Sequence, residues 1–320
     1  LPTPRGRVCT SQSQAEKYAA TMAHPLVVVA DAPDGPVVVC PDRTSIPRAV
    51  AECLEGNASG AVLIEELING PRVTASLLTD GATALPVPAT RLYSHSAQPY
   101  APANGAHSAA TAVWNKLETV LTQQIRDPLR VALHREGTAA NGWISTTCIA
   151  GPRGPLVQAI ELIPCGLEAV AVLLRLESDL LPLLVGCARR TLASVEPPRW
   201  RSDAVVAVAL QAVHGATDSP EAVLGELDPG VLIFHHATEP ALPNPYIPQA
   251  ARISTTRLPR LGSGSFSGYA PSHITDEPLV AIIAAADPDL ATARERVYAN
   301  LRRSRRATYV YRDDVGAREF

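Results

Sequence analysis

Lysine is nearly absent from this chain of 320 residues, in which Lys17 and Lys116 are the only two examples. Arginine supplies almost all of the 28 basic residues. Any chemistry that requires a lysine side chain therefore has almost no place in this protein.

An excess of positive charge and long apolar runs are also missing. The net charge is −3 and the calculated pI is about 6.3, so the chain has no basic field that would attract nucleic acid. No apolar run reaches the roughly 18–20 residues that a membrane span needs. The opening residues lack the charged segment and apolar core of a secretory signal. We expect a cytoplasmic protein that binds neither nucleic acid nor membranes.

The cysteines and the pair of adjacent histidines do not have the spacing of a metal site. The six cysteines show no CxxC spacing, which makes disulfides and a zinc site unexpected. His235 and His236 are adjacent on a predicted strand, where neighbouring side chains point to opposite faces. They are therefore not expected to bind one metal ion, and we expect no metal and no cofactor.

What the chain does have is a hydrophobic content of 46% and a clear alternation of strand and helix patterns. At this length it can form more than one domain. The predicted helices cover residues 12–23, 44–54, 109–124, 127–136, 168–188 and 288–303. Predicted strands lie within 24–39 (two), 60–89 (three), 143–149, 156–163, 204–213, 230–238, 279–286 and the terminal "ATYVYRD". Residues 90–108 are predicted to be a loop.

Four motifs resemble phosphoribosylamine–glycine ligase, an ATP-grasp enzyme of purine synthesis. The longest is "GAVLIEELINGPRVTASLLTDGATALPVPA" at 60–89, and the others are "RLESDLLPLL" at 175–184, "IFHHAT" at 233–238 and "YRDDVGAREF" at 311–320. The resemblance implies an α/β (α+β) fold, with an ATP-grasp-like body of two subdomains and a small β-rich C-terminal domain. It implies a lid subdomain at 1–60, a core subdomain at 61–194 and the C-terminal domain at 195–320.

The chain departs from this family at the positions that handle ATP. Val29, within the stretch "HPLVVVADAPDGPVVV" at 24–39, stands where the family has a lysine that meets the phosphates. Ala159 and Glu161 stand where a glutamate and an asparagine hold Mg²⁺, and Pro71 and Arg72 replace a glutamate pair near the ribose. The resemblance begins at the family's ATP-grasp region, so we also expect the family's N-terminal domain to be missing. We therefore expect that ATP-dependent ligation has been lost.

The resemblance implies a deep cleft between the two ATP-grasp-like subdomains. The remaining acid–base residues suggest that this cleft has been reused for another reaction. The predicted catalytic residues are Glu161, His107, Glu65 and Glu168. Glu161 has apolar sequence neighbours that would raise its pKa by burial, and His107 would titrate near neutrality on a closing loop. The predicted substrate-binding residues are Tyr100, Arg91, Tyr93, Trp143 and Val29. The hypothesis is cofactor-independent dehydration, conjugate addition or cyclisation of an apolar specialised metabolite.

Other interpretations remain open. The protein could be a non-catalytic scaffold, or a divergent ATP-grasp ligase that uses Arg72, Arg91 or Arg153 in place of lysine. Glu161 could be a buried partner of Arg175, Glu65 could cap a strand or pair with an arginine, and Trp143 could be a packing residue. The expected partner is a small-molecule substrate, with a homodimer as one possible assembly.

Overall fold

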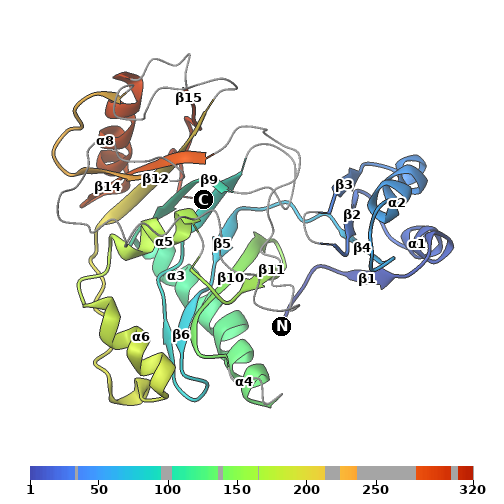
Figure 1. The fold of residues 1–320 in the computed structure, drawn as a ribbon, viewed down its shortest axis with the longest axis horizontal. Helices are drawn as coiled ribbons and strands as arrows, with labels where there is room; N and C mark the ends of the chain where they lie inside the picture. Colours follow the sequence, from blue (N-terminus) through green and yellow to red (C-terminus); the bar gives the residue numbers. More distant parts are fainter. Residues whose placement is uncertain are drawn as a thin grey trace, which may run out of the picture.

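A computed structural model describes residues 1–32, 35–94, 103–135, 140–164, 166–212, 224–235, 279–303 and 309–319. Within these ranges the chain forms a 4-stranded sheet from its N-terminal residues and an 11-stranded sheet from the rest. The small sheet and its two helices stand to one side of the larger body (Figure 1). No helix in these ranges has the length and apolar character to cross a membrane.

The N-terminal layer is an antiparallel sheet with helices on one face. Its strand order is β1-β4-β2-β3. The elements are β1 (Gly6–Cys9), α1 (Gln12–Ala19), β2 (Leu26–Ala30), β3 (Val37–Cys40), a 3-10 turn (Arg43–Ser45), α2 (Ile46–Leu54) and β4 (Val62–Glu66).

Side-chain alternation decides which face of this sheet the helices cover. Leu26 and Val28 of β2 and Ile64 of β4 are fully buried in one cluster with α1 and α2. The hydroxyl of Ser11 accepts a hydrogen bond from the Gln14 amide at 3.3 Å and so caps the start of α1. Because side chains alternate along a strand, the residues between those of the cluster point to the opposite face.

The larger sheet has the order β13-β14-β12-β9-β8-β5-β10-β6-β7, with β11 beside β10 and β15 beside β12. Its strands are β5 (Arg72–Thr74), β6 (Leu77–Thr79), β7 (Ala84–Pro86), β8 (Arg91–Ser94), β9 (Ala103–Ser108), β10 (Gly142–Gly151), β11 (Gly154–Glu161), β12 (Ala204–Ala212), β13 (Val231–His235), β14 (Leu279–Asp287) and β15 (Tyr309–Val310).

Helices pack around this sheet. One helical segment consists of α3 (Ala112–Leu121), a π-helical turn (Thr122–Arg126) and α4 (Asp127–Arg135). The others are α5 (Gly166–Leu173), α6 (Leu180–Arg189), a 3-10 turn (Leu192–Ser194) and α8 (Leu290–Arg303). The predicted mixture of helices and strands is therefore present, and most elements lie where the sequence places them.

The loop predicted at 90–108 is wrong for the part that the structure describes. Residues 91–94 form β8 and residues 103–108 form β9. In β9, Gly105 and Ala106 lie opposite Val208 and Ala207 of β12. Pairing with a distant apolar strand thus outweighs a local composition that is poor in strand formers.

The single helix predicted at 168–188 is also wrong, because the chain breaks between α5 and α6. Leu176 forms an isolated bridge with Trp200, and the Arg201 amide donates to the Arg175 carbonyl oxygen at 2.7 Å. Asp179 then accepts from the Leu181 amide at 2.9 Å and caps α6. The intervening residues leave the helix to pair with the linker that precedes β12.

Two strands pair with strands on the other side of the domain boundaries expected from the sequence. Strand β4 pairs with β1 and β2 of the N-terminal sheet, although its residues follow the boundary expected at residue 60. Strand β12 pairs with β9, so the C-terminal strands continue the larger sheet and do not form a sheet of their own. The three-way division into domains stays a prediction.

Candidate functional site

The face of the N-terminal sheet that points away from α1 and α2 combines apolar side chains with one carboxylate. Val27 and Val29 of β2 lie opposite Glu65 and Leu63 of β4, on the face away from α1 and α2. Val27 is 1% exposed and Val29 is 3% exposed. The predicted apolar wall at Val29 is therefore a buried strand position beside a carboxylate.

Glu65 is the carboxylate on that face, and it is 7% exposed. Burial, together with the negative charge of neighbouring Glu66, raises its pKa to about 7. On the other side Glu65 pairs with Gly6 of β1, where an added Cβ would come within 2.8 Å of the Glu65 Cβ. A glycine at position 6 is thus what lets β1 lie close over this residue.

Glu66 behaves differently although it is the next residue. Burial alone would raise its pKa, but the Arg153 side chain at 2.5 Å and the Arg5 amide at 2.8 Å hold it below its usual value. Arg153, which the sequence suggested as a substitute for a lysine, therefore forms an ion pair with Glu66 at the edge of the sheet.

Glu168 lies deep in the larger body at the start of α5. It is 2% exposed and accepts hydrogen bonds from the Ser76 hydroxyl and from the Ser145 hydroxyl, the latter at 2.9 Å. Burial raises its pKa, and these serine hydrogen bonds oppose the increase. Trp143 donates from Nε1 to the same Ser145 hydroxyl at 3.1 Å. These residues form a buried polar network, and Trp143 also packs in an apolar cluster with Leu78 and Leu183.

His107 lies on β9 and is fully buried, so its expected position on a loop is wrong. Its Nδ1 lies 2.9 Å from the Tyr93 hydroxyl, and its ring meets Trp114 edge-on with centroids 5.3 Å apart. Burial, with a smaller effect from Arg91, lowers its pKa to about 3. The expectation that His107 titrates near neutrality is therefore wrong, since the ring is neutral at physiological pH.

Tyr93 and Arg91, predicted to bind substrate, instead form hydrogen bonds with the C-terminal tail, which is residues 311–319. The Tyr93 hydroxyl accepts from the Gly316 amide at 3.1 Å, and Arg91 donates to the Arg318 carbonyl oxygen at 3.2 Å. The Arg91 guanidinium lies 4.9 Å from the centroid of the Tyr93 ring, and that of Arg312 lies at 5.6 Å. The structure thus brings Arg91, Tyr93 and His107 together. Tyr100 lies outside the described residues.

Glu161 does not have the apolar environment expected for it. It ends β11 and is partly exposed, and its neighbours Ile160 and Leu162 are 43% and 53% exposed. The predicted burial of Glu161 is therefore wrong. Its charge interacts with Arg72, whose pKa burial lowers to about 10 while Glu161 opposes the decrease. Arg175 instead donates to the Ser108 hydroxyl at 2.7 Å.

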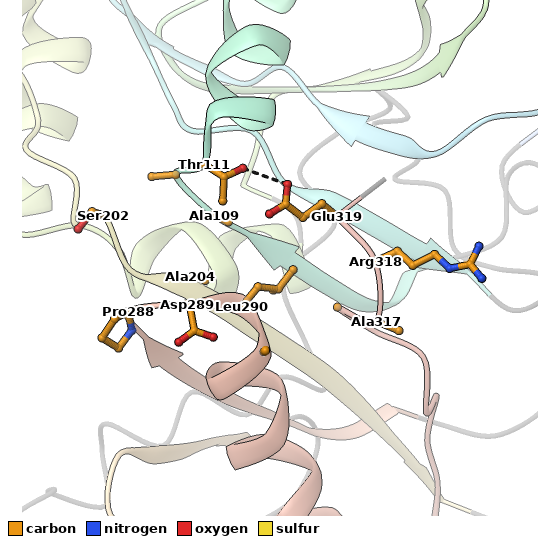
Figure 2. A pocket seen from close by; sticks show the side chains of 13 residues that line it. Ala109, Thr111, Ser202, Ala204, Pro288, Asp289, Leu290, Ala317, Arg318 and Glu319 are labelled. Carbon is orange, nitrogen blue, oxygen red and sulfur yellow. Dashed lines mark hydrogen bonds between the residues drawn. The ribbon is translucent and has the colours of Figure 1, made fainter.

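A separate pocket of about 380 Å³ lies where α3 and α8 begin and the C-terminal tail passes them. Figure 2 shows Thr111 donating to Glu319, at 3.0 Å, with Asp289 on the opposite side of the pocket. None of the predicted site residues lines it. The position of this pocket depends on four distant chain segments, so no local pattern in the sequence could have identified it.

Comparison with known proteins identifies the family. The sequence model of the phosphoribosylglycinamide synthetase ATP-grasp (A) domain matches residues 1–162. A phosphoribosylamine–glycine ligase from Caulobacter vibrioides is 28% identical over 253 residues, which are 74% of this chain and 59% of that protein. One from Phenylobacterium zucineum is 27% identical over 333 residues, covering 99% of this chain and 72% of the relative. The chain thus spans only 59% of the length of the Caulobacter relative.

Solved structures show the same fold. The phosphoribosylamine–glycine ligase of Thermotoga maritima has a TM-score of 0.67 at 15% identity, over 98% of this chain and 74% of that one. A biotin carboxylase from Campylobacter jejuni has a TM-score of 0.63 at 11% identity, over 98% and 64%. These likenesses confirm the predicted ATP-grasp-like fold class. The chain belongs to the phosphoribosylglycinamide synthetase ATP-grasp domain family.

Proposed function

We propose that this family member keeps the ATP-grasp scaffold and uses it for cofactor-independent general acid–base chemistry on an apolar specialised metabolite. The single observation that carries the proposal is Glu65, a buried carboxyl with a pKa of about 7 beside an apolar strand. A group of that pKa is present in both protonation states near neutral pH, which suits both proton abstraction and proton return. Glu65 therefore replaces Glu161 as the principal candidate.

The residues at the nucleotide-binding positions do not fit a magnesium–nucleotide complex of the kind that the family resemblance implies. Val29 is buried between Leu63 and Val37, and no cation accompanies it on that strand. Both lysines are exposed on helices, Lys17 on α1 and Lys116 on α3. Triphosphate binding normally depends on such cations.

The magnesium positions fit no better. Ala159 and Glu161 are two residues apart on β11 and so share a face, but only one of them is a carboxylate. That carboxylate interacts with the guanidinium of Arg72, a positive group next to the position where a second cation would have to bind. Among the described residues, no group of three or more His, Cys, Asp and Glu side chains is arranged to hold a metal ion.

In the proposed reaction, the Glu65 carboxylate removes a proton from a carbon next to a carbonyl group. The resulting carboxylic acid returns a proton when water leaves or when a new bond is formed. The apolar wall of Val27 and Val29 excludes water from the ionised carboxylate, which keeps its basicity high. Dehydration, conjugate addition and cyclisation all use this pair of steps.

The relatives favour a second candidate, a divergent ATP-dependent ligase, because both named relatives are phosphoribosylamine–glycine ligases. Calorimetric titration with MgATP and with MgADP separates the two candidates. We expect no saturable binding of either nucleotide. Saturable binding of MgATP would favour the ligase and contradict our proposal.

Turnover provides the second test. The chain would be incubated with a panel of apolar β-hydroxycarbonyl and α,β-unsaturated carbonyl compounds, and products followed by mass spectrometry. Glu65→Gln should abolish any turnover found, and Glu66→Gln should retain it, since Glu66 is in an ion pair at the edge of the sheet. If neither nucleotide binds and no panel compound is converted, a non-catalytic scaffold becomes the better description of the protein.

A further inference from the structure

Helix α6 is apolar on two opposite sides. Leu183, Gly186 and Cys187 are buried against the body of the protein. Leu181 is nevertheless 64% exposed, Leu184 39% and Val185 37%. An exposed leucine by itself needs no explanation, but three large apolar residues on one short helix do.

The exposed residues form one continuous strip. Leu181, Leu184, Val185 and Ala188 are spaced i, i+3, i+4 and i+7, and all four are exposed. At 3.6 residues per turn, this spacing places them on one side of the helix, opposite Leu183 and its buried neighbours. We call this set the α6 outer strip. A helix that is apolar all round is normally covered on both sides.

The α6 outer strip is accessible to another molecule. The helix lies at the periphery of the larger body, away from the N-terminal layer (Figure 1). Its inner side packs in a cluster with Leu78, Trp143 and Leu192, which fixes the helix firmly in place. The strip is therefore a rigid surface and not part of a loop.

Charges at the two ends of α6 indicate what covers the strip. Glu177 and Asp179 are exposed just before the helix, and Arg189 and Arg190 are exposed at its end. When two copies of α6 lie antiparallel about a two-fold axis, the acidic end of each meets the basic end of the other. An isologous contact requires such a self-complementary surface.

We propose that the α6 outer strip is the centre of a homodimer interface, in which α6 pairs antiparallel with α6 of a second copy of this chain. The four apolar residues form the dry centre and the two sets of charges form the rim, as in other protein interfaces. The strip covers a single short helix, so the dimer is a reversible one whose population rises with concentration. This proposal does not depend on the chemistry proposed above.

Sedimentation velocity over a range of protein concentrations tests the dimer. Wild type should shift from monomer to dimer as concentration rises. Leu181→Glu and Leu184→Glu should each weaken association by roughly 100-fold, because each places two carboxylates in the apolar centre. Val113→Glu, a matched change at an apolar position on α3 that is 49% exposed, should leave association unchanged.

A charge exchange tests the orientation and does not alter the apolar centre. Glu177→Arg and Arg189→Glu should each weaken association by roughly three- to tenfold, and the double variant should recover wild-type association. A wild type that stays monomeric at every concentration overturns the proposal. So does a dimer that is insensitive to Leu181→Glu and Leu184→Glu, or a double charge variant that fails to recover.

Discussion

At the scale of single residues, four glutamates in this chain show how environment sets acid–base character. Glu65 is buried, no cation in the described part of the chain compensates its charge, and its pKa rises to about 7. Glu66 is paired with Arg153, and its pKa falls. Glu168 is buried but hydrogen-bonded by two serines, and Glu161 is partly exposed. The first combination provides a proton acceptor that is matched to neutral pH.

The raised pKa of Glu65 predicts a particular pH dependence of stability. The pKa of a glutamate side chain in water is 4.5, and that of Glu65 in the folded protein is about 7. Between these values the folded state binds more protons than the unfolded chain, so stability is fully present at low pH and decreases as pH rises through this interval. The decrease amounts to roughly 3 kcal/mol.

Glu65→Gln should remove most of that decrease, and Glu66→Gln should leave the larger part of it, because burial is the main cause of the raised Glu65 pKa and the Glu66 charge is the smaller one. The measurement is hydrogen exchange of the β2 and β4 amides at increasing urea concentration, repeated at several pH values. Parallel pH profiles for wild type and Glu65→Gln would contradict the assignment.

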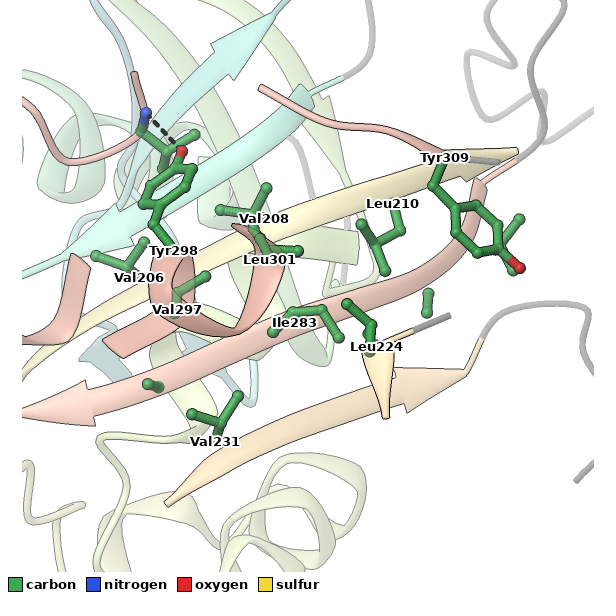
Figure 3. Packing of buried hydrophobic residues seen from close by; sticks show 14 of the residues in the cluster. Val206, Val208, Leu210, Leu224, Val231, Ile283, Val297, Tyr298, Leu301 and Tyr309 are labelled. Atoms are coloured by element: carbon green, nitrogen blue, oxygen red, sulfur yellow. Dashed lines mark hydrogen bonds between the residues drawn. The ribbon is translucent and has the colours of Figure 1, made fainter. Parts of the chain in front are cut away.

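At the scale of elements, the C-terminal tail packs against the middle of the larger sheet and forms hydrogen bonds there. Helix α8 packs Val297 and Leu301 over Val206, Val208 and Ile283 of β12 and β14 (Figure 3). Tyr298 of this helix accepts a hydrogen bond from the amide of Val315 at 3.1 Å. Val315 is fully buried and faces Gly105 of β9. The packing of the tail against β9 therefore depends on the absence of a side chain at position 105.

Gly105→Ala should destabilise the protein by about 2 kcal/mol, because the new Cβ would overlap Val315 Cγ2 and lie 3.1 Å from Cγ1. The double variant Gly105→Ala, Val315→Ala should lose less stability than the sum of the single variants, by about 1 kcal/mol or more. Gly151→Ala is a control, since its Cβ would lie 3.3 Å from a methyl group of Ile68 and 3.9 Å from the Gly154 carbonyl oxygen. Additive losses in a double-mutant cycle by urea unfolding would argue against this contact.

At the scale of the whole molecule, the N-terminal layer and the larger body have separate cores. The cluster of the N-terminal layer draws only on residues between Cys9 and Ile64, with partly buried neighbours from the same layer. Contacts between the two parts include the Arg153–Glu66 ion pair and the hydrogen bond from the Val157 amide to the Pro2 carbonyl oxygen at 2.8 Å. Such polar contacts at an edge couple two units only weakly.

We therefore expect the two parts to open as separate units. In native-state hydrogen exchange with increasing urea, amides of β2 and β4 should lose protection independently of those in β9 and β12. Gly105→Ala should lower protection in β9 and β12 and leave β2 and β4 unchanged. A uniform loss of protection across both parts would show a single cooperative unit.

Much of the fold could be predicted because its signals are local or belong to the family. The N-terminal strands and helices follow from short apolar runs and helix caps within short windows, as at Leu26 and Ser11. The family motifs indicated the ATP-grasp-like architecture. Strands β8 and β9 could not be predicted, because β9 acquires its strand structure by pairing with β12, roughly a hundred residues later in the chain, and β8 pairs with β9.

The sequence by itself determined the family, the near absence of lysine and the apolar character of the wall at Val29. These are properties of composition and of residue order, and folding does not change them. Only the tertiary structure decided which acid on this scaffold has a pKa near neutrality. The pKa of a carboxyl depends on how much water and how many charges surround it. Strands β1 and β2 surround Glu65 closely, whereas the apolar sequence neighbours of Glu161 lie exposed and leave it partly accessible.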